Sequence, residues 1–153
     1  MREANSAEMR GGAAFAHLRW PAQPCQLVSI RAQVHSWLAP LDLADDVEDD
    51  LVLAASEAAS NSIEHAYLTP TPGDTVELTF WTEARAVCIE IVDHGAWRVP
   101  SGRSTGRGRG IEIMQKLLAF VLIHYDARGT RVLLRHPLPG RSAFALHVAG
   151  RRT

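Results

Sequence analysis

The stretch ASEAASNSIEHAY at residues 55–67 is the most informative part of the sequence, because Glu57, Asn61 and His65 follow one another at intervals of four residues. In a helix, residues at this spacing stack one turn apart along one face. An acid, an amide and an imidazole in line are unusual on a plain surface helix. They suit a site that holds a metal–phosphate group and orients a hydroxyl, since an amide oxygen can bind Mg²⁺ beside phosphates and a carboxylate can accept a hydroxyl proton.

The segment IVDHGAW at residues 91–97 adds a carboxylate at the end of an apolar run. Asp93 at that position can accept a hydrogen bond from the amino group of an adenine. Gly95 lets the backbone pass close to the ring, since no Cβ intrudes there. An Asp-x-Gly turn with no ligand is the simpler interpretation, but the neighbouring motifs favour the adenine site.

The segment GRGRGIEIMQKL at residues 106–117 places glycines directly before a helical pattern. It lacks the Gly-Lys-Ser/Thr end of a Walker loop, so a P-loop is excluded. An Arg-Gly nucleic-acid segment has poor support from one short run in a nearly neutral chain. Glycines before a helix can form a nest of N–H groups that faces phosphate. We therefore expect this segment to contact phosphate, through residues Arg107, Gly108, Arg109, Gly110 and Ile111. Either of the two arginines could point toward the γ-phosphate.

Composition indicates one ordinary globular domain. The chain has 153 residues, 46% hydrophobic and 22% charged, with a net charge of −1. Nothing global draws it to nucleic acid or to an anionic membrane. No apolar run approaches the roughly 20 residues of a membrane span, and the start lacks the apolar core of a signal peptide. Cys25 and Cys88 are expected to be reduced thiols in a cytoplasmic protein.

Hydrophobic periodicity predicts one α/β unit. Helices are expected at 27–38, at 45–66 and from residue 111, the last with Ile111, Met114, Leu118 and Val121 on one side. Strands are expected at 14–20, 76–81, 87–92, 121–126 and 130–136, the middle two and the last two as hairpins. Residues 1–12 are predicted to be disordered, residues 13–136 to form the domain, and residues 137–153 to be an extension in which 143–148 adds a strand or packs elsewhere.

Together these motifs resemble those of the GHKL (histidine-kinase-like, Bergerat-fold) ATPases, and within them the small anti-sigma factor serine kinases. The resemblance covers roughly residues 15–136. Four motifs in the expected order carry it: Glu57-x-x-x-Asn61-x-x-x-His65-Ala66-Tyr67, Asp93-x-Gly95, Gly108-Arg109-Gly110-Ile111-x-Ile113-Met114 and Gly129-Thr130. Each motif alone is weak, but the set is specific.

The resemblance implies a fold and a site. The fold is an α/β (α+β) two-layer sandwich, with a Bergerat-type mixed sheet that carries helices on one face. The cofactors are ATP and Mg²⁺. In the resembled kinases the residue matching Glu57 is the general base, Asn61 holds Mg²⁺, and Thr130 supplies a hydroxyl near the adenine edge. His65 either orients the site or is a structural histidine near the helix end.

The implied function is a cytoplasmic, partner-switching serine/threonine protein kinase. Such a protein binds a sigma factor to silence it and phosphorylates a small antagonist protein on Ser or Thr. It releases sigma on meeting the unphosphorylated antagonist, without direct contact to nucleic acid or membrane. The resemblance also suggests a homodimer, with residues 14–39 as its surface. The alternative is a non-catalytic module that sequesters a partner, with nucleotide structural or absent.

Two departures from the family pattern affect the expected affinity. Trp97 stands where the family usually has a second glycine of the Asp-x-Gly-x-Gly box. Its side chain would either narrow the adenine pocket or swing out and close over it. The loop at 99–106 is also short for an ATP lid, so weak ATP affinity or fast exchange is expected.

Overall fold

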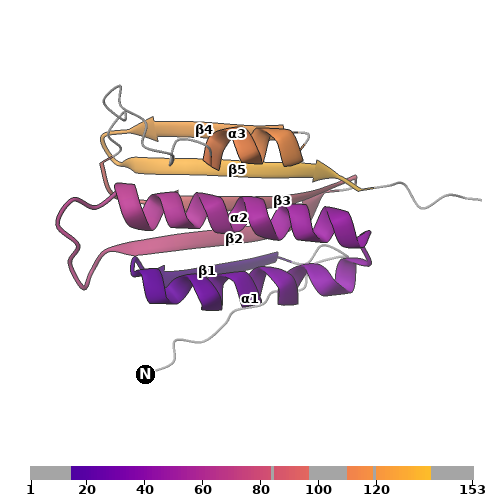
Figure 1. Cartoon of the computed structure of the whole chain (residues 1–153), viewed down its shortest axis with the longest axis horizontal. Helices are drawn as coiled ribbons and strands as arrows, with labels where there is room; N and C mark the ends of the chain where they lie inside the picture. Colours follow the sequence, from indigo (N-terminus) through magenta and orange to yellow (C-terminus); the bar gives the residue numbers. More distant parts are fainter. Residues whose placement is uncertain (1–14, 84, 97–109, 119, 139–153) are drawn as a thin grey trace, which may run out of the picture.

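Five strands form one sheet, and three helices lie across one of its faces (Figure 1). The computed structural model describes residues 15–83, 85–96, 110–118 and 120–138. Within these residues the elements are, in order, β1 (Phe15–Pro21), α1 (Leu27–Leu38), α2 (Asp45–His65), β2 (Thr75–Glu83), β3 (Ala86–Asp93), α3 (Gly110–Leu117), β4 (Phe120–Asp126) and β5 (Gly129–Pro137). Short 3-10 turns at Pro24–Gln26 and Ala39–Leu41 flank α1.

Within the described residues the predicted elements are confirmed with one exception in assignment, whereas the predictions for residues 1–12, 99–106 and 143–148 fall outside those residues. Helix α2 ends at His65, one residue before the predicted end, and both predicted hairpins are present. The expectation that Val121 lies on the apolar side of the last helix is wrong, because α3 ends at Leu117 and Val121 lies in β4. From Phe120 to Ile123 the burial alternates with period two, because the strand turns Val121 and Ile123 toward the core and leaves Phe120 and Leu122 exposed.

The fold class and the helices on one face are confirmed, but the sheet is antiparallel at every described pairing rather than mixed. Helices α1 and α2 connect β1 to β2, and β2 then runs antiparallel beside β1. Strand β4 does run in the same direction as β3, but β5 lies between them in the order β1-β2-β3-β5-β4. A parallel pairing is therefore never formed among these strands.

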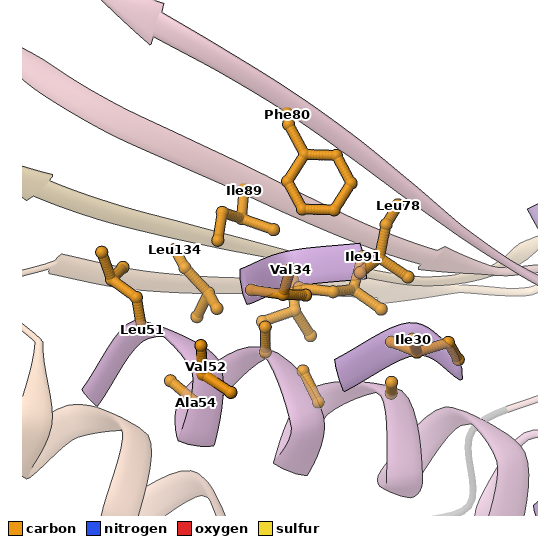
Figure 2. Close-up of a cluster of buried hydrophobic side chains, with 14 of the residues drawn as sticks. Ile30, Val34, Leu51, Val52, Ala54, Leu78, Phe80, Ile89, Ile91 and Leu134 are labelled. Atoms are coloured by element: carbon orange, nitrogen blue, oxygen red, sulfur yellow. The ribbon is translucent and has the colours of Figure 1, made fainter. Parts of the chain in front are cut away.

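The core lies between the sheet and the helices (Figure 2). Alternate residues of the central strands point toward the helices and are fully buried, including Leu78, Phe80, Ile89, Ile91 and Leu134. Each such side chain contributes about 1.5–3 kcal/mol relative to an exposed position. Helix α2 meets them mainly with small residues, which let its backbone lie close to the sheet: Ala54, Ala55, Ala58, Ala59 and Ser62.

The other face of the sheet carries alternating charged and apolar side chains. Its glutamates pair with arginines of other strands, at Arg19–Glu77 (3.1 Å) and Arg131–Glu90 (2.7 Å) between neighbouring strands and at Arg135–Glu83 (3.0 Å) across the end of β3. Cys88 is buried on this face, and burial raises the pKa of its thiol to about 11. Within the described residues, no helix is long and apolar enough to cross a membrane.

Candidate active site

Glu57, Asn61 and His65 follow one flank of α2, as their spacing predicts. The opposite flank meets α1, where Arg31 donates a hydrogen bond to the Ser56 hydroxyl at 3.5 Å. Side chains advance about 100° per residue around a helix, which turns Asn61 about 140° away from Ser56. Since α2 lies between α1 and α3 (Figure 1), the three predicted residues are on the α3 side of the helix.

The side chains on this flank are available to bind a ligand. Glu57 and Asn61 are half-buried, and neither side chain makes a hydrogen bond or an ion pair with another residue that the structure describes. His65 lies further toward solvent, with its side chain 50% exposed and its Nε2 atom 3.8 Å from the Glu64 carboxylate. The geometry thus places, one turn apart, an acid and an amide that have no partner among the described residues.

Asp93 ends β3 on the side of the sheet that faces the helices, and only 2% of its surface is exposed. Its Oδ1 atom accepts hydrogen bonds from the N–H groups of Gly95 (3.2 Å) and Thr130 (3.1 Å). The Ser62 hydroxyl of α2 donates a further hydrogen bond to the carboxylate. Three of the predicted motifs, those around Asn61, Asp93 and Thr130, therefore meet at one point.

The Asp93 carboxyl is held in an unfavourable environment for a charge. Burial raises its pKa above the ordinary value of 3.8, and this effect outweighs the hydrogen bonds from Ser62, Thr130 and Gly95 that lower it. A carboxylate kept nearly dry between a helix and a sheet is a strong acceptor for any donor that reaches it. Sites that perturb pKa values in this way are frequently functional.

Two glycines let the backbone close around Asp93. A Cβ on Gly95 would overlap the carbonyl oxygen of Ala66 at the end of α2, and the next N–H, that of Ala96, donates to that same oxygen at 2.8 Å. Gly129 has a φ of +139°, and a Cβ there would overlap the carbonyl oxygen of Asp93. Both glycines are thus required by the fold itself, in addition to the close approach to a ring that we expect for Gly95.

Part of the predicted site lies outside the described residues. Arg107, Gly108, Arg109 and Trp97 fall there, so the phosphate-binding glycines and the effect of the tryptophan stay predictions. Gly110 begins α3, and Ile111 packs against the core. The described residues contain no group of three or more His, Cys, Asp or Glu side chains able to hold a metal. A Mg²⁺ ion at Asn61 would take most of its remaining ligands from phosphate and water.

Sequence reasoning assigned no role to two residues that shape this site, although one of them, Tyr67, belongs to a quoted motif. Ser62 was not singled out, although a hydroxyl on the buried side of α2 requires a partner and Asp93 supplies it. The Tyr67 hydroxyl accepts the N–H of His94 at 2.9 Å, a contact between residues 27 apart in sequence. No local pattern predicts such a contact.

A profile of the Histidine kinase-like ATPase domain matches residues 20–136, most of the chain. The chain belongs to the histidine kinase-like ATPase family. Solved structures agree with this assignment in their fold. The RsbU and RsbW domains of Rv1364c from Mycobacterium tuberculosis superpose with a TM-score of 0.62 at 24% identity, over 82% of this chain and 33% of that one.

A second similar structure is the histidine kinase domain of the Erythrobacter litoralis EL346 blue-light activated histidine kinase. It has a TM-score of 0.53 at 16% identity, over 73% of this chain and 61% of that one. The present histidine kinase-like ATPase thus spans about a third of the first matched chain and three fifths of the second.

ATP, usually with Mg²⁺, is the ligand that membership of the histidine kinase-like ATPase family implies. The donor set of this chain fits it. Asp93 offers a buried acceptor at the sheet, and Asn61 and Glu57 offer unpaired oxygen atoms on the neighbouring helix. Ser62, the residue after Asn61 in α2, contacts Asp93, so an adenine end and a phosphate end can belong to one continuous site.

The raised pKa of Asp93 predicts a pH dependence of stability for this histidine kinase-like ATPase. Because the folded-state pKa lies above 3.8, the stabilising effect of the protonated carboxyl is complete below that value and is lost as the pH rises through the folded pKa. In an Asp93→Asn variant the amide oxygen still accepts both backbone N–H groups. We expect its free energy of unfolding, relative to wild type, to increase over this range by about 1.4 kcal/mol for each pH unit that separates the folded-state pKa from the unfolded-state pKa.

Urea unfolding of both proteins between pH 4 and pH 8 measures the difference. Ser62 and Thr130 are unchanged in the variant, so the comparison isolates the charge of Asp93. A difference that is constant with pH would show that the Asp93 carboxyl titrates at its ordinary value.

Proposed function

We propose that this histidine kinase-like ATPase is a protein serine/threonine kinase of the anti-sigma, partner-switching type. It binds Mg·ATP, sequesters a sigma factor in the cytoplasm, and phosphorylates a small antagonist protein on Ser or Thr. The observation that carries the proposal is the Glu57 carboxylate, half-buried, without a partner among the described residues and one helical turn from Asn61. The resemblance of the whole motif set to the anti-sigma factor serine kinases supports the choice of substrate.

Each predicted residue has a role that its environment suits. Asn61 would hold Mg²⁺ through its amide oxygen, and the ion would neutralise charge on the phosphates. Asp93, with the Thr130 hydroxyl beside it in the next strand, receives the adenine amino group. Glu57 accepts the proton of the attacking Ser or Thr hydroxyl while the oxygen bonds to the γ-phosphorus and the bond to the ADP oxygen breaks.

The chemistry of the labelled product tests the proposal. The purified chain is incubated with Mg²⁺, γ-labelled ATP and the unphosphorylated antagonist proteins of the same organism. We expect label on the antagonist that survives acid, as phosphoserine and phosphothreonine do. Label that acid removes and base preserves would indicate phosphohistidine and overturn the assignment. Stable partner binding with no label at all would favour the non-catalytic sequestering module.

Replacement of the metal ligand gives a second expected result. An Asn61→Ala variant should lose the Mg²⁺-dependent part of its ATP affinity, a decrease of at least roughly tenfold by analogy with other changes at metal sites. Titration calorimetry with and without Mg²⁺ measures it. Ser60→Ala is the matched control, because the Ser60 side chain leaves the helix about 100° away from Asn61 and its hydroxyl donates to Glu64 at 3.2 Å. Equal magnesium dependence in wild type and Asn61→Ala would remove Asn61 from the metal site.

A further inference from the structure

Tyr67 ties the segment of residues 93–96 to the end of α2 and the start of β2. Its hydroxyl donates to the carbonyl oxygen of Thr75 at 2.7 Å and accepts the N–H of His94 at 2.9 Å. Its ring is half-buried against the core. Burial raises the pKa of the phenol, so the hydroxyl keeps the proton that it donates to Thr75. The 93–96 segment is therefore anchored by a rigid side chain that directly follows the helix carrying Asn61.

Glu77 holds the same segment from the opposite face of the sheet. His94 donates from Nε2 to Glu77 Oε1 at 2.9 Å, and the Glu77 side chain is only 12% exposed. Arg19 and His17 of β1 contact the same carboxylate, each at 3.1 Å. Burial alone would raise the pKa of Glu77, but the hydrogen bond from His94 and the neighbouring charges hold it below its ordinary value.

Tyr67 and Glu77 anchor the segment at Asp93 and His94, two consecutive residues whose side chains point to opposite faces of the sheet. Asp93 points toward the helices and His94 is held on the open face by Glu77, so the backbone between them is fixed from both sides of the sheet. We propose that Tyr67 and Glu77 are positioning residues that hold the 93–96 segment so that Asp93 reads the adenine amino group. The inference rests on the proposed ATP site and adds what sets its selectivity for the base.

The ratio of the affinities for two nucleotides that differ in the base distinguishes a positioning role of Tyr67 and Glu77 from an effect on the stability of the fold alone. Inosine triphosphate has the same phosphates and sugar as ATP but an oxygen in place of the amino group. Wild type is expected to bind ATP more tightly than inosine triphosphate in calorimetry. Tyr67→Phe keeps the ring and removes the hydroxyl, which leaves the His94 N–H without its partner. We expect the ratio of the two affinities to fall about tenfold.

A loss of folded protein would not produce this result. Unfolding lowers the number of binding sites for both nucleotides equally and leaves the ratio of their dissociation constants unchanged. Far-UV circular dichroism at the assay temperature checks the folded fraction of each variant. An unchanged ratio in folded Tyr67→Phe would overturn the role of Tyr67.

Two changes at Glu77 test the second anchor. Glu77→Ala removes the acceptor for His94 and should lower the affinity ratio, whereas Glu77→Gln keeps an acceptor oxygen and should restore it. Glu90→Ala is the matched control, because Glu90 lies on the same face and pairs with Arg131 at 2.7 Å rather than with a residue of the 93–96 segment. A ratio that falls equally in Glu77→Ala and Glu90→Ala would overturn the role of Glu77.

The experiment also separates the two proposals from each other. If wild type bound neither nucleotide, the proposed ATP site itself would fail. If wild type bound both with equal affinity, Asp93 would not read the amino group. If wild type selects ATP and the variants do so equally well, the kinase proposal stands and only the positioning role is excluded.

Discussion

A Glu57→Gln variant is expected to transfer phosphate to its antagonist roughly 10²–10⁴-fold more slowly than wild type, the usual effect of removing a general base. The substitution keeps the shape of the side chain, so packing at this half-buried position on α2 is preserved. An amide cannot accept the hydroxyl proton at neutral pH. Nucleotide affinity should be unchanged, because neither Asp93 nor Asn61 is altered. Single-turnover transfer from γ-labelled ATP gives the rate, and calorimetry gives the affinity.

Glu64→Gln is the control for this prediction. Glu64 is exposed two turns further along the same helix and accepts a hydrogen bond from Ser60, so its replacement removes one negative charge of α2 and leaves the Glu57 carboxylate in place. We expect its transfer rate to match wild type. Equal slowing in both variants would attribute the effect to helix charge, and a parallel loss of ATP affinity in Glu57→Gln would make Glu57 a binding residue rather than a base.

The secondary structure of this chain is largely predictable because its patterns are local. The alternation through Val76, Leu78 and Phe80 specifies a strand with one buried face, and the structure buries those three residues completely. The end of the third helix is harder to predict. An apolar residue such as Val121 fits both a helical and a strand period when the two elements lie almost end to end.

Strand order could not be obtained from the sequence. Strand β5 inserts between β3 and β4, and this placement depends on contacts between residues about 40 apart, such as Asp93 with Thr130. Hairpin signals report only which consecutive strands pair. The same insertion makes every pairing among the described strands antiparallel, which is why the expected mixed sheet was wrong while the fold class was right.

The candidate site divides in the same way. Glu57, Asn61 and Asp93 could be chosen from spacing and chemistry, because a polar residue at the edge of an apolar pattern is a local signal. The partners that organise Asp93 could not, since Ser62 and Tyr67 act through contacts that only the folded chain creates. Sequence therefore selects candidate ligand-binding residues more readily than the residues that position them.

Gly129→Ala is expected to destabilise the protein by about 2–6 kcal/mol, through backbone strain and overpacking together. Gly129 has a φ of +139°, a conformation that residues with a Cβ rarely adopt, and the added methyl would overlap the Asp93 carbonyl oxygen. Neither cost is easily relieved, because β3 and β5 are paired across this point and Thr130 donates to Asp93. Thermal unfolding should show a lower Tm by roughly 2–4 °C per kcal/mol for a chain of this size.

Gly73→Ala is the matched control, since Gly73 lies in a turn where an added Cβ would meet only the Thr71 hydroxyl oxygen, at 4.0 Å. Its φ is not positive. There the change should be neutral or slightly stabilising, because alanine restricts the unfolded chain more than glycine does. A small effect in Gly129→Ala, equal to that of Gly73→Ala, would mean that the β4–β5 turn can shift away from Asp93. In that case nucleotide binding should weaken even though the protein stays folded, because Thr130 would move with the turn and its hydrogen bond to Asp93 would be lost.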